Sequence, residues 1–194
     1  LLMGEIPIYE PGLDVMVQKN TAEGRLHFAT DMATAIPAAD AVFLAVGTPS
    51  SRRGDGYADL TYIYAAAKEL ASHLRDYTVV IDKSTVPVGT ARQVERIIRE
   101  SNPNALFDMA SNPEFLREGA AINDFMRPDR VVIGVESKKA EAILREIYKP
   151  LFLQDTPIVC TTIETAELAK YAANAFLAVK ISYINEIAGI CEAV

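Results

Sequence analysis

Two glutamates in the segment SNPEFLREGAAINDF, residues 111–125, could serve as acid–base groups. Glu114 and Glu118 lie four residues apart, so a helix would place both carboxylates on one face. Asn112 is a good N-cap and Pro113 suits the first helical position, which predicts that a helix begins here. Because glutamates in a first turn also complement the helix dipole, the local sequence leaves two interpretations open: an ordinary helix start, or two carboxylates directed at a ligand.

The last segment of the chain reads as one long helix. From residue 161 to residue 194 the helical pattern is unbroken, and it opens with the capping-box sequence TTIE. A helix of about 30 residues spans roughly 50 Å, which exceeds the size of one small domain. We therefore expect it to connect two domains, and the apolar residues on almost every side of it predict that it is buried.

A polar stripe runs along this helix. At about 100° per residue, four polar residues fall on one side of it: Glu167, Lys170, Asn174 and Asn185. An unpaired charge in a buried position is costly, so Lys170 must have a partner. It could pair with Glu167 at the i,i+3 spacing, extend to solvent, or face a ligand together with Asn174.

The composition excludes several classes of function. The net charge of −7 and the isoelectric point near 4.9 argue against a nucleic-acid partner, because phosphate binding needs a basic face. No apolar stretch is long enough to span a bilayer, so we expect no membrane partner. Cys160 and Cys191 lack metal-type spacing, which favours a reducing cytoplasm. With only His27 and His73 available, both in structural roles, we expect no metal site and no Ser-His-Asp chemistry.

Apolar runs alternate with helical patterns along the chain. Four runs rich in β-branched residues predict strands, at residues 41–46, 78–82, 106–110 and 130–135. Helical patterns lie between and after them, at residues 59–75, 90–100 and 137–149. Strands that are continuously apolar and alternate with helices indicate an α/β fold, with a Rossmann-like, mostly parallel sheet that is covered by helices on both faces.

Polar side chains follow three successive predicted strands. They are Thr48 and Ser50, then Ser84 and Thr85, then Asn112 and Glu114. In open parallel sheets, ligands bind beyond the carboxyl ends of the strands. One polar strand end is usually only a turn, but three on a common edge indicate the floor of a binding site, which favours a ligand-directed role for Glu114.

Five ordered motifs resemble the nucleotide-sugar 6-dehydrogenases: IPIYEPGLD, VGTPS, DKSTVPVGT, SNPEFLREGAAINDFMRPDRVVIG and ELAKYAANAFLAVKISYINEIA. The resemblance covers essentially the whole chain, and the stretches DKSTVPVGT and FMRPDR favour the bacterial members that act on UDP-glucose over those that act on GDP-mannose. It implies oxidation of a sugar C6 alcohol to a carboxylate by two NAD molecules in succession, through a cysteine thiohemiacetal and thioester. Together with the length of the last helix, it also implies a homodimer.

The resemblance implies roles for individual residues. NAD would lie along Val46, Gly47, Thr48, Pro49, Ser84, Thr85, Val86 and Glu118. The sugar nucleotide would contact Glu114, Phe115, Leu116, Glu118, Lys170 and Asn174. In catalysis, Glu114 would be the general base on water in thioester hydrolysis, and Thr85 would lie near the reacting carbon. Lys170 and Asn174 would hold the developing oxyanion.

Two parts that this family needs are absent from the 194 residues. There is no G-x-G-x-x-G turn after a first strand, and neither cysteine has the glycine-rich context of the family's nucleophile. We therefore interpret residues 1–160 as a nucleotide-binding domain without its first strands, and residues 161–194 as the helix that leads to a missing second domain. The missing parts would precede Leu1 and follow Val194, and this piece alone is expected to be inactive.

Three alternatives remain open. The substrate could be GDP-mannose or UDP-N-acetylmannosamine. The β-hydroxyacid dehydrogenases also place a lysine and an asparagine one turn apart on a connecting helix, but the two NPEFLRE carboxylates have no evident task in a single two-electron oxidation. The chain could instead be a non-catalytic half that serves dimerisation, because it contains neither the nucleophile nor the phosphate loop.

Overall fold

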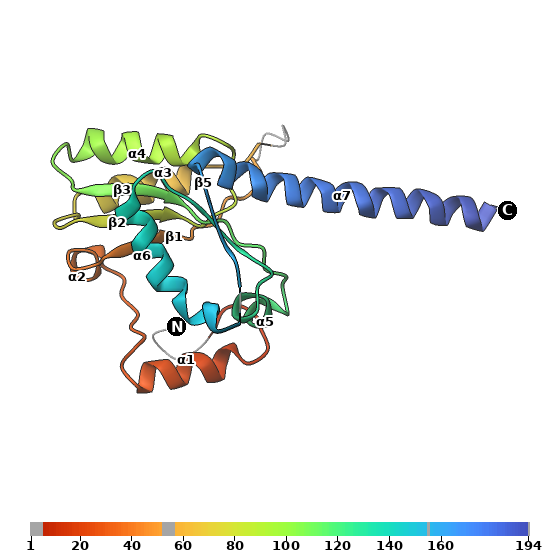
Figure 1. The fold of residues 1–194 in the computed structure, drawn as a ribbon, viewed down its shortest axis with the longest axis horizontal. Helices are drawn as coiled ribbons and strands as arrows, with labels where there is room; N and C mark the ends of the chain where they lie inside the picture. Colours follow the sequence, from red (N-terminus) through yellow and green to blue (C-terminus); the bar gives the residue numbers. More distant parts are fainter. Residues whose placement is uncertain (1–5, 52–56, 155, 194) are drawn as a thin grey trace.

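The computed structural model describes residues 6–51, 57–154 and 156–193. Within these ranges the chain forms a five-stranded sheet with helices on both faces (Figure 1). The strands are β1 (Ala41–Leu44), β2 (Thr78–Asp82), β3 (Phe107–Ser111), β4 (Val131–Gly134) and β5 (Ile158–Thr161). The helices are α1 (Leu13–Ala22), α2 (Met32–Ala35), α3 (Thr61–Ala71), α4 (Thr90–Ser101), α5 (Ala121–Met126), α6 (Lys138–Tyr148), the 3-10 helix η1 (Lys149–Gln154) and α7 (Ile163–Ala193).

The strands lie in the sheet in their order along the chain, and most neighbours are parallel. β1, β2 and β3 are parallel, β4 is antiparallel to β3, and β5 is parallel to β4. This confirms the Rossmann-like, mostly parallel sheet. The fully described connection from β3 to β4, residues 112–130, contains only the short α5.

One row of paired residues crosses all five strands and fixes their ends relative to one another. It consists of Leu44, Asp82, Ser111, Gly134 and Thr161. The chain therefore leaves β1, β2 and β3 at one edge of the sheet, as the sequence predicts. Because Thr161 lies in the same row, α7 begins beside that edge.

Helices cover both faces of the sheet because alternate strand residues point to opposite sides. On one face, Val80 and Met109 pack with α3 and α4. On the other, Val79 and Ile81 pack with α6. The four predicted strands and the three predicted helices between them are confirmed, with bounds that lie within the predicted segments or extend one residue beyond them.

The N-terminal helices α1 and α2 were not predicted from the sequence. Neither contains a buried residue, so neither presents an apolar stripe to the core that a periodicity could reveal. α1 lies away from the sheet and close to α5 (Figure 1). The segment before it approaches the same helix, since a Cβ built on Gly12 would lie 4.0 Å from Cδ1 of Ile122.

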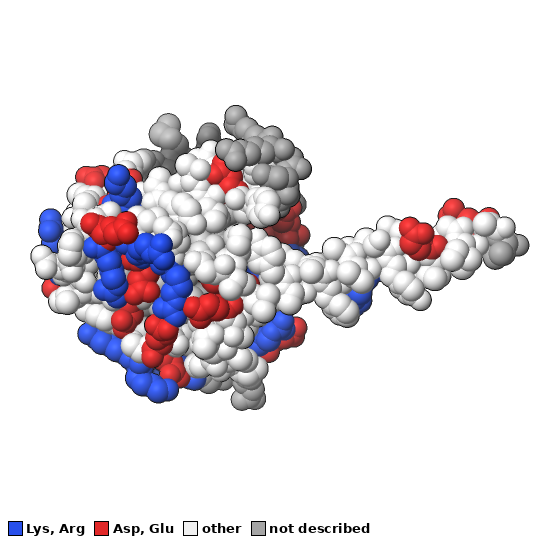
Figure 2. Space-filling model, turned by 90° about the horizontal axis from the view of Figure 1, so that it is seen from above, with Lys and Arg blue, Asp and Glu red and all other residues white. Residues whose placement is uncertain are grey.

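α7 is 31 residues long, which confirms the predicted long helix, but most of it is exposed. Its buried residues lie in the first eight, and beyond them the helix projects from the domain (Figure 1). The projecting part is mostly uncharged (Figure 2) and exposes large apolar side chains such as Phe176, Tyr183 and Ile190. The prediction that the whole helix is buried is therefore wrong for this chain, because its described segments bury only residues within the first eight of the helix. Among the described residues, no helix combines the length and apolar character needed to cross a membrane.

Candidate active site

The turns after β1 and β2 are tied together by hydroxyl groups. The Thr48 hydroxyl donates a hydrogen bond to the carbonyl oxygen of Thr85 over 2.9 Å, and the Ser84 hydroxyl donates one to the carbonyl oxygen of Val46 over 2.8 Å. The structure therefore brings together the two segments for which a cofactor role was predicted. Val86 differs from its neighbours, because its side chain is buried in the hydrophobic core.

A cavity of about 350 Å³ lies between these two turns and α7. Its lining residues are Thr48, Ser50, Ala58, Thr85, Tyr171, Asn174 and Ala175. Thr48 and Thr85, with a predicted cofactor role, thus share a cavity with Asn174, which has a predicted substrate role. Hydroxyl and amide groups at the ends of parallel strands suit the amide and ribose hydroxyls of a dinucleotide, so the residues present fit NAD.

The base of α7 is held against the sheet by a close approach of two backbones. A Cβ built on Gly134, at the end of β4, would come within 2.7 Å of the backbone of α7, so only glycine fits there. Thr162 is the N-cap, since its hydroxyl accepts a hydrogen bond from the Thr165 N–H over 3.2 Å. The predicted capping box is therefore displaced by one residue, and Glu164 instead pairs with Arg92 at 2.7 Å.

Glu167 bonds to the first amides of α4 and does not pair with Lys170. Its carboxylate accepts hydrogen bonds from the N–H groups of Gly89 at 2.7 Å and Ala91 at 2.8 Å. The first amides of a helix lack partners within the helix and carry the positive end of its dipole, so a carboxylate is stabilised there. Burial raises the pKa of Glu167, and the bonds from Ala91 and Gly89 oppose this rise.

Lys170 reaches the loop that follows β3. Its Nζ lies 3.0 Å from Oε1 of Glu114, and its side chain is only 8% exposed. The same Nζ lies 5.4 Å from the ring centroid of Phe115, which adds a cation–π contact. The two local alternatives for Lys170, a pair with Glu167 and extension to solvent, are therefore wrong.

A hydrogen-bond network that was not predicted from the sequence lies beside this pair. The Lys83 Nζ donates hydrogen bonds to the carbonyl oxygen of Asn112 at 3.2 Å and to its Oδ1 at 3.1 Å, and it lies 3.4 Å from the Tyr148 hydroxyl. Tyr148 also donates to Oδ1 of Asn112. Lys83 directly follows β2 and precedes Ser84, so its position at the end of a strand could have identified it as a candidate site residue.

The amine of Lys83 has no carboxylate among its hydrogen-bond partners named above. Burial lowers its pKa to about 8; the charge of Glu114 opposes this shift, and that of Lys170 adds to it. An amine with such a pKa changes its charge close to neutral pH. Tyr148 stays a neutral donor, because burial raises its pKa to about 12, although its bond with Asn112 opposes the rise.

Asp82, the last residue of β2, is buried with one oxygen unpaired. Its Oδ1 accepts a hydrogen bond from the Ser84 N–H over 3.1 Å, while its Oδ2 has no hydrogen-bond partner among the described residues. Burial raises the pKa of this carboxyl to about 7; the Ser84 amide opposes the rise, and Glu167 adds to it. Asp82 is therefore protonated in a large fraction of molecules at neutral pH.

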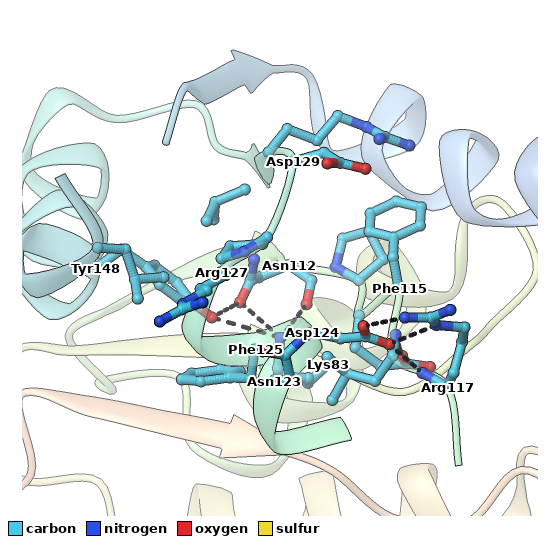
Figure 3. A pocket seen from close by; sticks show the side chains of 17 residues that line it. Lys83, Asn112, Phe115, Arg117, Asn123, Asp124, Phe125, Arg127, Asp129 and Tyr148 are labelled. Carbon is cyan, nitrogen blue, oxygen red and sulfur yellow. Dashed lines mark hydrogen bonds and ion pairs between the residues drawn. The ribbon is translucent and has the colours of Figure 1, made fainter. Parts of the chain in front are cut away.

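A larger cavity of about 420 Å³ lies between the loop after β3, α5 and the segment before β4 (Figure 3). Its charged lining residues are Lys83, Glu114, Arg117, Asp124, Arg127, Asp129 and Arg130. Arg117 and Asp124 pair at 2.7 Å. Phe115 and Leu116, two predicted substrate contacts, also line it, and the guanidinium carbon of Arg130 lies 4.9 Å from the ring centroid of Phe115.

The prediction that a helix begins at Asn112 is wrong. Residues 112–120 are irregular, and α5 begins only at Ala121. Asn112 is buried and its amide donates to the carbonyl oxygen of Val132 over 2.8 Å, so it does not cap a helix. Glu114 and Glu118 therefore share no helix face: Glu114 meets Lys170, whereas Glu118 is exposed in the turn that follows.

The cysteines and histidines lie apart from these cavities. Cys160 and Cys191 are exposed and form no disulfide. His27 is exposed and lies outside any strand, with Nε2 3.0 Å from the carbonyl oxygen of Gly24. Within the described ranges no group of three or more histidine, cysteine, aspartate or glutamate side chains is placed to hold a metal ion.

Comparisons with known proteins identify the relatives of this chain. Residues 1–152 match the model of the UDP-glucose/GDP-mannose dehydrogenase family, NAD binding domain, and residues 164–194 match the central domain of the same family. The chain is 61% identical over 196 residues to the UDP-glucose 6-dehydrogenase of Rhizobium meliloti; the match covers 100% of this chain and 45% of that protein.

Two solved structures have the same fold over most of the chain. A UDP-glucose dehydrogenase from the archaeon Pyrobaculum islandicum superposes with a TM-score of 0.88 at 44% identity, over 95% of this chain and 43% of that one. A GDP-mannose dehydrogenase from Pseudomonas aeruginosa gives a TM-score of 0.88 at 37% identity, with the same coverage of 95% and 43%. The chain thus spans less than half the length of the relatives that it matches.

Proposed function

The chain belongs to the UDP-glucose/GDP-mannose dehydrogenase family, and we propose that it forms the NAD-binding domain and connecting helix of a UDP-glucose 6-dehydrogenase. In this proposal, residues 1–160 are the nucleotide-binding domain and residues 161–194 lead to a second domain that supplies the nucleophilic cysteine. The observation that carries the proposal is the contact between Lys170 of α7 and Glu114 of the loop after β3, at 3.0 Å beside the strand ends.

In this proposal, the sugar C6 reacts beside these two complementary groups. The ammonium of Lys170, held in a nearly buried position, stabilises negative charge that develops on the substrate oxygen. Asn174 lies one helical turn further along α7 and would supply a second donor from the cavity that it shares with Thr85, whereas Glu114 lines the other cavity. Glu114 is half-buried, so a water molecule can reach its carboxylate and lose a proton to it during thioester hydrolysis.

NAD is the cofactor that the matched family model assigns to residues 1–152. Two NAD molecules, bound in succession, would supply the hydride acceptor, one for each of the two oxidations of the alcohol to the carboxylate. The hydroxyls of Thr48, Ser50 and Thr85 are the groups of this chain that would orient it, since all three line the cavity between the strand ends and α7. Glu118, a further predicted contact, is exposed and free to face a ligand from the adjacent turn.

The choice of UDP-glucose depends on sequence similarity more than on fold. Identity to the UDP-glucose enzymes of Rhizobium meliloti and Pyrobaculum islandicum is 61% and 44%, against 37% to the GDP-mannose enzyme, while both solved structures superpose with the same TM-score of 0.88. UDP-glucose is therefore the proposed substrate, and GDP-mannose and UDP-N-acetylmannosamine are the alternatives.

Substrate oxidation by the enzyme that carries this chain tests the proposal. We expect NADH formation with UDP-glucose, close to two molecules per sugar as the two-step oxidation requires, and much slower formation with GDP-mannose or UDP-N-acetylmannosamine. NADH absorbance and product analysis on the same sample give both quantities. A rate with GDP-mannose equal to or above that with UDP-glucose would contradict the substrate assignment, and a single NADH per sugar would contradict the two-step reaction.

We also propose a homodimer that forms through α7, in a reducing cytoplasm. The exposed apolar side chains of the projecting part of α7 support the homodimer, because large exposed apolar patches usually mark a surface that binds another protein. The two cysteines, which form no disulfide, support the reducing cytoplasm. Light scattering on the whole enzyme tests the dimer, and a monomer at working concentration would contradict it. A dimer that lacks all dehydrogenase activity would favour the non-catalytic alternative.

A further inference from the structure

The loop that carries Glu114 has no helix or strand to hold it in place. Residues 112–120 are irregular, so their backbone groups need partners elsewhere in the molecule. We propose that Glu10, in the N-terminal segment before α1, is a positioning residue that fixes the far end of this loop and thereby keeps Glu114 against Lys170. This inference rests on the proposed function, in which Glu114 acts in the oxidation of the sugar nucleotide.

The near end of the loop is anchored to the sheet. Asn112 is 1% exposed and donates its side-chain amide to Val132 on β4, while its backbone N–H donates to the carbonyl oxygen of Asp82 over 2.8 Å. Lys83 holds the carbonyl oxygen of the same residue. Three residues thus fix the point at which the loop leaves the sheet, but the chain then runs eight further residues before α5 begins.

The middle of the loop is held by carboxylates close in sequence. Oε2 of Glu114 accepts a hydrogen bond from the Leu116 N–H. Asp124 on α5 accepts hydrogen bonds from the Arg117 N–H at 2.9 Å and from the guanidinium of the same residue at 2.7 Å and 3.0 Å. These bonds shape the loop, yet both of their acceptors belong to the loop or to α5 and move with them.

Glu10 supplies an anchor from a distant part of the chain. Its Oε2 accepts a hydrogen bond from the Gly119 N–H at 2.9 Å, and its Oε1 lies 3.5 Å from the Ile122 N–H at the start of α5. Gly119 has φ +78°, a left-handed conformation that other residues rarely adopt, so the turn that presents this amide to Glu10 depends on glycine. One carboxylate thereby joins the N-terminal segment to the turn between the loop and α5.

The geometry divides the two oxygens of Glu114 between two tasks. Oε2 closes the loop on Leu116, and Oε1 meets Lys170. Glu114 and Gly119 are five residues apart, so in this proposal a displacement of the turn at Gly119 reaches the Glu114 carboxylate through the short loop between them. Glu10 touches neither cavity, so it acts on the reaction through the loop and not on the substrate directly.

Hydrogen–deuterium exchange and steady-state kinetics on the enzyme that carries this chain test the role of Glu10. In Glu10→Ala we expect faster exchange of the Gly119 and Ile122 amides, and a kcat with UDP-glucose that falls about 10- to 100-fold while the enzyme stays folded. In Glu10→Gln the remaining amide oxygen can accept the Gly119 bond, so both exchange and kcat should return close to the wild-type values.

Asp14→Ala is the matched control, because Asp14 is an exposed acid four residues further along the chain, in the first turn of α1. It should change neither readout. Unchanged exchange at Gly119 in Glu10→Ala would overturn the anchor, and faster exchange with an unchanged kcat would overturn its effect on Glu114. An equal loss of activity in the Gln and Ala variants would also overturn the role as stated. A wild-type enzyme that oxidises no nucleotide sugar would remove the proposed function instead, since the exchange readout needs no substrate.

Discussion

Glu167 and Lys170 lie one helical turn apart at the base of α7, both are almost fully buried, and they serve different parts of the molecule. Glu167 accepts hydrogen bonds from the first amides of α4, so its charge is used inside the scaffold. Lys170 pairs with Glu114, a half-buried carboxylate on an irregular loop. Their i,i+3 spacing would allow them to pair with each other, but each contacts a different part of the molecule.

The difference shows how a helix can hold a scaffold and a site with neighbouring residues. The partners of Glu167 are backbone amides at a helix start, which cannot leave without unfolding α4. The partner of Lys170 is a side chain that water can reach, so a ligand can compete for the amine at modest cost. We therefore expect changes at Glu167 to affect stability and changes at Lys170 to affect chemistry.

The largest expected effect follows from replacing Lys170. In the proposed enzyme, Lys170→Met should lower kcat about 10²- to 10³-fold, which is the usual cost of removing one donor to a developing oxyanion. The unfolding free energy should change by less than about 1 kcal/mol, because the methionine fills the same space and the released Glu114 remains partly hydrated. Steady-state kinetics and urea denaturation on the same preparation measure the two quantities.

Lys170→Arg sharpens this test, since the guanidinium keeps the charge but changes the geometry of its donors. It should retain more activity than Lys170→Met. A Lys170→Met enzyme with normal kcat would end the catalytic assignment, and one that is mainly destabilised would place Lys170 with Glu167 in the scaffold.

The strands and main helices could be predicted because their apolar patterns are strong. β2 lies at its predicted residues 78–82, and the expected meeting of three strand ends at one edge follows from the row that joins Leu44, Asp82 and Ser111. Each of these features depends on local periodicity and on the general geometry of parallel sheets.

What could not be predicted depends on contacts between distant residues. Asn112 and Pro113 have the sequence of a helix start, but the burial of Asn112 against β4 outweighs this local preference. The two partners of Glu167, Gly89 and Ala91 at the start of α4, are 78 and 76 positions away in the sequence. No spacing along α7 can reveal them. The exposure of α7 beyond Lys170 likewise depends on which other segments pack on it, whereas its apolar composition alone predicted burial.

The second prediction concerns Glu167 and the stability of the protein. Glu167→Ala should lower the unfolding free energy by about 2–3 kcal/mol, because the two α4 amides lose a charged acceptor in a buried position. Urea denaturation followed by circular dichroism measures the change. Activity per folded molecule should stay close to the wild-type value, in contrast to Lys170→Met.

Glu164→Ala provides the comparison for this variant. Glu164 lies three residues earlier on the same helix and pairs with Arg92, but its side chain is 40% exposed, so its loss should cost less than about 1 kcal/mol. Equal effects of the two variants would mean that the α4 amides find water readily, and the assignment of Glu167 to the scaffold would lose its support.

The smallest expected effect is a pH dependence that Asp82 imposes beneath this part of α7. Its pKa is raised to about 7 in the folded protein by burial, opposed by the Ser84 amide and increased by Glu167. Because the folded state then holds a proton that the unfolded chain releases near pH 3.8, the contribution of Asp82 to stability is complete below pH 3.8 and is lost as the pH rises to about 7. Relative to Asp82→Asn, which cannot ionise, the wild type should lose at least about 1.4 kcal/mol of unfolding free energy between pH 4 and pH 8, the value of one pKa unit.

Urea denaturation at several pH values measures this loss, with Asp76→Asn, an exposed aspartate, as the control that should follow the wild type. The loss should become smaller in Glu167→Ala, since one of the charges that raises the pKa of Asp82 is then gone. Parallel pH curves for wild type and Asp82→Asn would contradict the prediction. They would show that Asp82 is ionised in the folded protein and that its unpaired oxygen is hydrated.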